Sequence, residues 1–234
     1  MTKKQPILEL KGVSRSFPQG KDKVIALRKT DFTAYGGELV AVIGPSGSGK
    51  STFLTIAGGL QRPSKGSVLI HGNDISKLSD KELSAVRLRY VGFILQASNL
   101  VPFLTIEKQF QLLDKVINRK TSKTAIYKLL GELGIKKLAP KYPSDLSGGE
   151  RQRAVIGKVL YGESKLVLAD EPTASLDTQK AYEIVELLAK ETHEQQKATI
   201  MVTHDERLLR YCDKVYEMHD GTLKKRSGHA KTNK

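Results

Sequence analysis

One short motif constrains the fold of this 234-residue sequence more than any other feature. Residues Gly44–Ser51 read Gly-Pro-Ser-Gly-Ser-Gly-Lys-Ser, a complete G-x-x-x-x-G-K-[ST] pattern. Glycines let consecutive backbone N–H groups converge on an anion, and a helix that begins at the motif points its positive end at the same place. The motif predicts a strand–loop–helix unit that cradles phosphate, with a plain glycine-rich turn as the alternative.

The surrounding segments have the patterns that such a unit requires. Leu39–Ile43 is a short apolar run typical of a buried strand, and Lys50–Gly58 has a helical pattern. Lys165–Ala169 and Ala198–Val202 are further apolar runs that polar residues follow at once, and Thr178–Lys190 repeats apolar residues at helical spacing. This alternation predicts an α/β fold with a parallel sheet.

The stretch from about residue 99 to 143 lacks strand signals. Ile106–Ile117 and Lys123–Leu133 are instead typical of helices. We therefore expect one domain over residues 1–234, with a core from about 1–95 and 144–234 and a helical insertion from about 96–143.

A second chemical signal follows much later in the chain. Leu166–Glu171 is an apolar run that ends in two adjacent carboxylates. In a phosphoryl-transfer site Asp170 would hold Mg²⁺ and Glu171 would polarise the attacking water. By itself this pattern favours a solvated strand end or a helix cap before Pro172, but the phosphate loop upstream favours catalysis. Within that loop, Lys50 can reach the β- and γ-phosphates and Ser51 can bind Mg²⁺.

A third motif, Leu146–Arg153, reads Leu-Ser-Gly-Gly-Glu-Arg-Gln-Arg and places a serine and two glycines before a helical pattern. This makes another anion cradle, although one ATP needs only one cradle in its own subunit. The combination resembles the nucleotide-binding subunits of ABC transporters, whose LSGGQ signature appears here with Glu150 in the last place. The resemblance extends over essentially the whole chain. It includes a Q-loop at Gln96, a D-loop at Ser175–Asp177 and a switch histidine at His204.

The resemblance implies head-to-tail dimers, in which ATP lies between the phosphate loop of one subunit and the signature of the other. Gln96 would then contact Mg²⁺ or the water and link the ATP state to the insertion, and His204 would hydrogen-bond to the γ-phosphate. Phe17 matches the aromatic residue that stacks on adenine, with a core phenylalanine as the alternative. The implied fold is a P-loop core with a small antiparallel β subdomain and a helical insertion.

These inferences fix a complete set of expected site residues, with ATP and Mg²⁺ as cofactors. The expected catalytic residues are Glu171, His204 and Gln96, and the expected metal ligands are Ser51, Gln96 and Asp170. The expected nucleotide-binding residues are Phe17, Gly44, Pro45, Ser46, Gly47, Ser48, Gly49, Lys50, Ser51, Thr52, Ser147, Gly148, Gly149, Glu150 and Asp177.

Two pairs of segments indicate a branch of the family. Ala169–Asp177 and Asp220–Leu223 look like the branch of lipoprotein-release, macrolide-exporter and haem-exporter ATPases, and Gly92–Leu104 and His204–Leu209 are most similar to haem-efflux ATPases of Gram-positive bacteria. The resemblance implies a homodimer bound to a separate membrane permease at the cytoplasmic face of the membrane, driving haem efflux. Lipoprotein release, antimicrobial-peptide or macrolide export and cell-wall mechanotransmission remain alternatives.

The net charge of +14, from 39 Lys and Arg against 25 Asp and Glu, favours anionic partners. The basic residues gather between Lys115 and Lys141 and in the tail from Gly221. A solvated face and a membrane or partner contact are both open for them. We expect no nucleic acid partner, because related ATPases that act on ribosomes carry two cassettes and those that act on DNA carry long coiled coils.

Three further features bear on location and partners. Met1–Pro6 has no apolar segment behind its charges, so we expect no secretory signal. The single cysteine, Cys212, fits a cytoplasmic protein. Val101–Leu104 is an apolar cluster directly after Gln96, and we predict that it lines a groove for a permease helix; packing within the insertion is the alternative.

Overall fold

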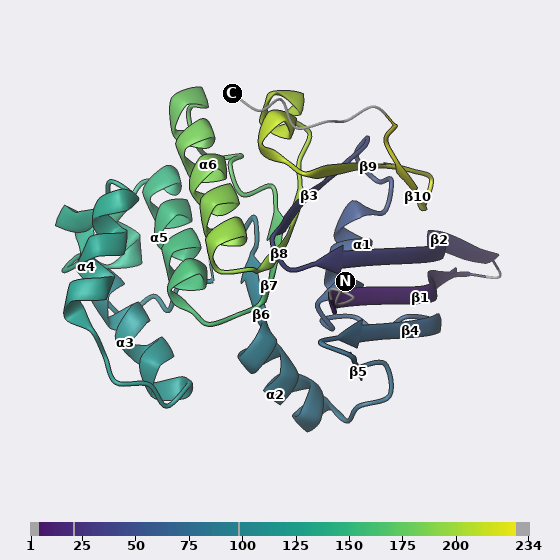
Figure 1. Ribbon diagram of the computed structural model, residues 1–234, viewed down its shortest axis with the longest axis horizontal. Coiled ribbons are helices and arrows are strands. Elements are labelled where there is room, and N and C mark those ends of the chain that lie inside the picture. Colours follow the sequence, from purple (N-terminus) through teal and green to yellow (C-terminus); the bar gives the residue numbers. More distant parts are fainter. Residues whose placement is uncertain (1–4, 21, 98, 228–234) are drawn as a thin grey trace.

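The computed structural model describes residues 5–20, 22–97 and 99–227. Two sheets lie next to each other, and a group of helices extends from the larger one (Figure 1). The segment Met1–Lys4, which bears on the predicted lack of a signal, and Lys231 and Lys234 of the basic tail lie outside the described residues.

The larger sheet has the order β10-β9-β3-β8-β7-β6. Its strands are β3 (Glu38–Ile43), β6 (Val91–Ile94), β7 (Leu166–Asp170), β8 (Ala198–Val202), β9 (Lys214–His219) and β10 (Thr222–Lys225). β3 pairs in parallel with β8 and β9, and β7 pairs in parallel with β8 and β6, whereas β10 runs antiparallel to β9. The predicted parallel α/β sheet is confirmed.

The smaller sheet is antiparallel and has the order β2-β1-β4-β5. Its strands are β1 (Pro6–Gln19), β2 (Asp22–Tyr35), β4 (Lys65–Ile70) and β5 (Asn73–Asp74). Helix α1 (Lys50–Ala57) packs between the two sheets, where the Phe53 ring meets Phe32 of β2 edge to face at 5.2 Å. The antiparallel subdomain implied by the resemblance is therefore present, and α1 joins it to the core.

Strand β3 shows why the strands of the larger sheet are continuous apolar segments in the sequence. Leu39, Ala41 and Ile43 face a core cluster that helices cover, whereas Val40 and Val42 face a second cluster around α1 and the smaller sheet. Successive side chains of a strand point to opposite faces, so burial of both faces requires an apolar residue at every position.

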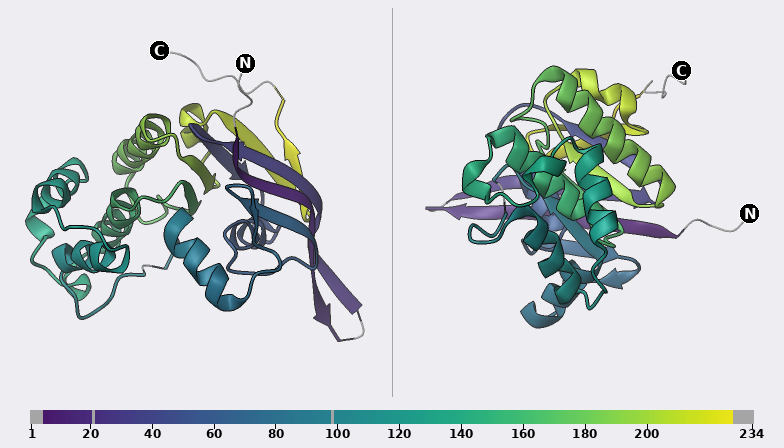
Figure 2. Two further views of the ribbon diagram at one scale, coloured as in Figure 1. Left: turned by 60° about the horizontal axis from the view of Figure 1, so that its bottom comes forward. Right: turned by 90° about the vertical axis from the view of Figure 1, so that its left-hand side faces the viewer.

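The remaining helices are α2 (Asp80–Tyr90), α3 (Ile106–Val116), α4 (Lys123–Glu132), α5 (Gly148–Tyr161), α6 (Thr178–Glu194) and the short 3₁₀ segments η1 (Lys136–Leu138), η2 (Pro143–Asp145) and η3 (Glu206–Tyr211). Helices α3, α4 and α5 lie together at one end of the molecule (Figure 2). The two predicted helices of the insertion are confirmed, and no strand occurs among the described residues from 99 to 143. Helix α5, beyond the predicted insertion, packs on both of them: a Cβ on Gly157 would lie 2.6 Å from the Leu133 side chain.

Candidate functional site

The phosphate loop connects the end of β3 to the start of α1, as the motif predicts. Its conformation requires glycine at two positions, because Gly44 has φ 146° and Gly49 has φ 107°. A Cβ on Gly44 would lie 2.2 Å from the Met218 carbonyl oxygen, and a Cβ on Gly49 would lie 2.3 Å from the Ala26 carbonyl oxygen. The loop is thus held between β9 and β2, and its shape depends on backbone packing.

Polar groups of the loop face inward. The Lys50 Nζ donates hydrogen bonds of 2.8 Å to the carbonyl oxygens of Gly44 and Pro45, so its ammonium lies over the loop. The buried Ser48 Oγ has no hydrogen-bond partner among the described residues. Because Lys50 also lines the pocket over the loop, its ammonium fits an anion that would receive its hydrogen bonds there.

A pocket of about 560 Å³ opens over this loop and collects most of the expected site residues. The expected site residues that line the pocket are Gly44, Ser46, Gly47, Gly49, Lys50, Ser51, Thr52, Gln96, Asp170, Glu171 and His204. They come from the loop between β3 and α1, from α1, from the end of β7, and from the segments after β6, β7 and β8. Parallel strands end at one edge of the sheet, so residues far apart in the chain meet there.

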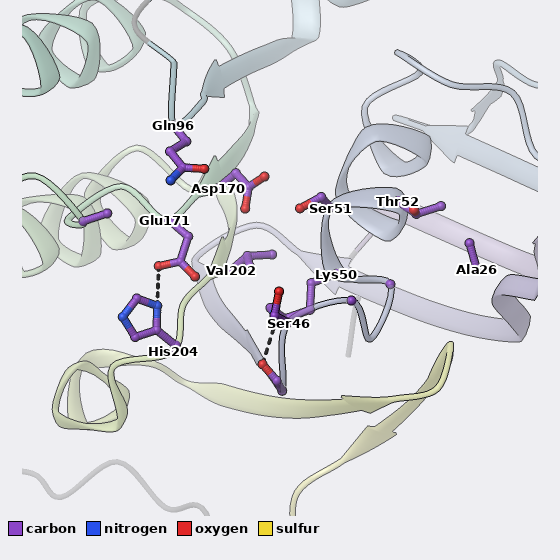
Figure 3. A pocket seen from close by; sticks show the side chains of 14 residues that line it. Ala26, Ser46, Lys50, Ser51, Thr52, Gln96, Asp170, Glu171, Val202 and His204 are labelled. Atoms are coloured by element: carbon purple, nitrogen blue, oxygen red, sulfur yellow. Dashed lines mark hydrogen bonds and ion pairs between the residues drawn. The ribbon is translucent and has the colours of Figure 1, made fainter.

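Three oxygen-bearing side chains meet inside this pocket. Figure 3 shows the Asp170 carboxylate facing the Ser51 hydroxyl across the pocket, with the Gln96 amide directed toward them. Carboxylate, hydroxyl and amide oxygens are hard ligands of the kind that Mg²⁺ prefers, with water and substrate phosphate as its other ligands. The residues present therefore fit a magnesium ion held between protein and phosphate.

Glu171 and His204 are in hydrogen-bond contact at the rim of the pocket, with 2.7 Å between His204 Nδ1 and Glu171 Oε2 (Figure 3). Glu171 has φ 51°, a left-handed conformation that is uncommon for a residue other than glycine, and its N–H donates to the Val202 carbonyl oxygen at 3.0 Å. Backbone strain of this kind concentrates at functional sites. The fold therefore fixes the direction of this carboxylate.

The signature residues lie elsewhere. Ser147 is the N-cap of α5: its Oγ accepts from the Glu150 N–H at 3.3 Å, and the Ser147 N–H donates to Glu150 Oε2 at 2.8 Å. The Ser147 N–H and, next, the Ser147 hydroxyl lower the pKa of the Glu150 carboxyl group. Glu150 thus acts as a helix cap, and neither it nor Ser147, Gly148 or Gly149 lines the nucleotide pocket of its own chain.

The other expected nucleotide-binding residues also lie outside the pocket lining. Phe17, on β1, is half-buried and not part of the core, so the core alternative is wrong; the Arg15 guanidinium lies 4.6 Å from the centre of its ring. Asp177 is the N-cap of α6 and accepts from the Lys180 N–H at 2.9 Å. Pro45 and Ser48 belong to the loop but line no part of the pocket.

The apolar cluster after Gln96 forms a loop with an exposed aromatic residue. The Phe103 side chain is 76% exposed, whereas Val101 and Leu104 are half-buried. The buried Gln109 of α3 binds this loop: its Oε1 accepts from the Val101 N–H at 3.0 Å, and its Nε2 donates to the carbonyls of Val101 and Leu104 at 2.7 and 3.0 Å. For Phe103 the alternative of packing within the insertion is wrong.

Comparison with known proteins identifies the family. Residues 27–174, more than half of the chain, match the ABC transporter family. The chain belongs to this family. It is 42% identical over 219 residues, 92% of this chain and 98% of the relative, to a hemin import ATP-binding protein, HrtA, of Staphylococcus haemolyticus. It is also 39% identical to the macrolide export ATP-binding/permease protein MacB of Agrobacterium fabrum, over 94% of this chain but only 34% of MacB.

Solved structures agree with this assignment. The ATP-binding cassette MJ0796, in a dimeric post-hydrolysis state bound to ADP and Pi, superposes with a TM-score of 0.87 at 32% identity, over 95% of this chain and 100% of the cassette. The predicted P-loop fold is confirmed, and the chain is an ATP-hydrolysing enzyme of the ABC type. ABC ATPases bind ATP and generally work as dimers with a membrane permease.

Sequence reasoning missed three residues that line the pocket of this ABC ATPase: Ala26, Ala174 and Val202. Ala26 lies on β2, far upstream of the motif, and reaches the pocket only because the smaller sheet packs against the loop. No local pattern marks such a residue. Val202 ends the buried strand β8, so its place at the sheet edge was available from the strand pattern.

Proposed function

We propose that this ABC ATPase works as a head-to-tail homodimer that drives haem export through a separate membrane permease. The similarity to HrtA carries the proposal, because it covers 98% of a relative that is named as an ATP-binding protein alone. The name of that relative states hemin import, whereas MacB is named for export. We infer export because MacB is 39% identical over 94% of this chain and because the Q-loop segment resembles haem-efflux ATPases.

The pocket supports a division of labour among its residues. Lys50 and the loop N–H groups would bind the β- and γ-phosphates, while Ser51, Asp170 and Gln96 would hold Mg²⁺. The bound ion would neutralise charge that develops on the phosphates. Phe17 would stack on adenine, and Thr52 would contribute to the phosphate end of the pocket.

Glu171 would orient and polarise the attacking water. Its fixed backbone and its 2.7 Å contact with His204 hold the carboxylate in one direction, which is what a positioned general base requires. His204, whose side chain is 74% exposed in this chain alone, would turn toward the γ-phosphate when a second subunit closes over the pocket.

The position of the signature supports a dimer. Ser147 and Gly148, which are exposed, and the half-buried Gly149 form a helix start that lies outside the nucleotide pocket of their own chain. In a head-to-tail dimer they would bind the γ-phosphate in the pocket of the other subunit, with Asp177 at the same interface. A helix N-terminus favours an anion at that point.

Two features support docking of a permease. Phe103 is exposed on a loop that Gln109 fixes, so the ring is presented in a defined place at the cost of leaving apolar surface in water. An apolar groove of about 280 Å³ lies beside Asn99, lined by Leu88, Val91, Phe93, Leu113, Ile117 and Val159. No helix in the described part of the chain has both the length and the apolar character to cross a bilayer, and we propose that a permease places this ATPase at the cytoplasmic face of the membrane.

Deletion of the gene in its native host tests cargo and direction together. If the complex exports haem, the deletion strain should become sensitive to haem at concentrations that the parent tolerates, and the Glu171→Gln variant should not restore tolerance. Unchanged tolerance with poor growth on haem as the iron source would indicate import. A defect in macrolide resistance or lipoprotein release would replace haem as the cargo.

A further inference from the structure

Lys158 lies in an unusual place for a lysine. It belongs to the last turn of α5 and lines the apolar groove, where its side chain is half-buried. Its Nζ donates one hydrogen bond, of 3.0 Å, to the Asn99 carbonyl oxygen, and it forms no ion pair with any carboxylate of the described ranges. Burial lowers the pKa of this ammonium group.

A second polar group lines the same groove. Ser164 is only 7% exposed, and its Oγ has no hydrogen-bond partner in the described part of the chain. The hydroxyl is packed tightly, since a Cβ on Gly92 would lie 2.8 Å from it. Buried hydroxyl groups are normally hydrogen-bonded, so an orphaned one at a cavity wall points to a group that binds there.

The carboxylate that lines the groove, Glu163, is not an ion-pair partner of Lys158. The Glu163 side chain is 72% exposed and forms an ion pair with Arg119 at 3.4 Å. The two groups that the groove offers, the Lys158 ammonium and the Ser164 hydroxyl, both donate hydrogen bonds. A ligand that fits them must bring an acceptor, and a negative charge would offset the cost of burying the ammonium further.

The extent of the apolar surface favours a protein helix over a small acid. Leu88, on the groove wall, is 51% exposed, and Leu112 and Val116 of α3 are 39% and 49% exposed. Leu112 and Val116 each precede a residue of α3 or its C-cap, Leu113 and Ile117, that lines the cavity of about 280 Å³. Grooves of this kind bind the apolar face of an amphipathic helix.

We propose that the groove recognises a cytoplasmic helix of the permease by an aspartate or glutamate side chain that accepts hydrogen bonds from Lys158 and Ser164. This inference rests on the proposed function, because the permease supplies the helix. It adds a specific requirement: apolar residues of the helix fill the groove, and a single carboxylate sets its register. A helix with a lysine at that position would place two ammonium groups together and be rejected.

Zero-length cross-linking tests the pair directly. The full-length ATPase is purified from its native host in detergent with its membrane partner and treated with a carbodiimide, which joins a lysine amine to a carboxylate in contact with it. We expect mass spectrometry to find Lys158 joined to an aspartate or glutamate of an integral membrane protein. Lys158→Arg should keep the partner and lose the cross-link, since a guanidinium group does not form this amide.

Loss of the charge should also weaken the complex. Lys158→Met should lower recovery of the partner by about 30-fold, as for other buried charges that lose their pairing group. Ser164→Ala should weaken it by about 3–10-fold. Lys115→Met, an exposed lysine of α3 that does not line the groove, is the matched control. ATP binding by every variant checks folding, because none of the three residues lines the nucleotide pocket.

The outcomes separate this inference from the proposed function. If the membrane protein is recovered equally with Lys158→Met, or Lys158 cross-links only to Glu163 or to a second copy of this chain, the carboxylate contact is wrong and permease docking stands. If the wild-type chain recovers no membrane protein, the proposed function fails and this inference fails with it.

Discussion

The nucleotide pocket and the proposed docking surface, which comprises the Val101–Leu104 loop and the apolar groove, are built in opposite ways. In the pocket the backbone forms the site: Gly44 and Gly49 adopt positive φ, and neighbouring carbonyl oxygens leave no room for a Cβ. In the docking surface the side chains form the site, and a buried glutamine fixes the backbone beneath them.

Nucleotide binding and docking therefore depend on different kinds of residue. Phosphate carries charge and binds N–H groups, so the pocket depends on a few polar atoms in fixed positions. A helix in a groove is held by apolar area, so the docking surface depends on exposed side chains such as Phe103. Because Gln96 lines the pocket and Asn99 lines the groove, one short segment joins the two. Substitutions should therefore separate chemistry from coupling.

The largest expected effect is on the chemical step. Glu171→Gln keeps the shape of the side chain and the left-handed backbone but removes the charge that orients the water, so ATP hydrolysis should fall by about 10²–10⁴-fold. Phosphate release under ATP saturation measures it, and ATP should then hold the dimer closed. The same change at Glu206, whose side chain is 68% exposed, should have no effect. A Glu171→Gln enzyme with near-normal turnover would exclude Glu171 as the catalytic carboxylate.

The next prediction distinguishes the phosphate loop from the signature, the two segments that can bind an anion. Lys50→Ala removes a charged phosphate contact and should weaken ATP binding by the monomer by about 10–100-fold. Ser147→Arg should leave monomer binding within about two-fold and block the closed dimer, because its cradle serves the other subunit. Titration with a fluorescent nucleotide and size-exclusion chromatography measure the two properties.

The structure provides a matched control for the lost helix cap. Ser79 caps α2 in the same way, with a Ser79 N–H to Glu82 Oε2 distance of 2.8 Å. Ser79→Arg should therefore cost as much stability as Ser147→Arg, about 1 kcal/mol, while the dimer still closes. If monomeric Ser147→Arg loses ATP, the signature does not act across an interface.

Local patterns predict much of this molecule, and tertiary packing decides the rest. The strands Leu166–Asp170 and Ala198–Val202 were predictable because both faces are buried, and the loop because only glycines fit its backbone. Ala26 was not predictable, since sheet packing alone brings it to the pocket. The Ser-x-x-Glu pattern of Ser147–Glu150 predicts the capping role of Glu150, but the same residues also form the signature motif. The apolar groove was not predicted: none of Val101–Leu104 lines it, and Leu88, Leu113 and Val159, which do, come from three helices.

A smaller effect should appear at the docking surface. Phe103→Asp replaces an exposed ring by a charge and should weaken permease association by about 30-fold or more, as at a central interface residue, with ATP affinity unchanged. Co-purification from membranes and nucleotide titration measure the two quantities. Leu60→Asp, at another exposed apolar residue (47%), is the control. Equal recovery of the permease with Phe103→Asp would remove this loop from the interface.

The smallest effect should come from the glutamine beneath the loop. Gln109→Leu leaves the Val101 N–H and the carbonyls of Val101 and Leu104 without their partner, which should lower the free energy of unfolding by about 1–3 kcal/mol. Denaturant titration measures this loss. Phe103 keeps its side chain but loses its fixed place, so permease association should weaken by less than it does in Phe103→Asp. Gln111→Leu, which removes a single 2.9 Å hydrogen bond to Glu107 on the same helix, controls for the loss of an amide. If Gln109→Leu weakened ATP binding as strongly as permease association, the loop would act on the nucleotide pocket itself, and the separation of chemistry from coupling would be lost.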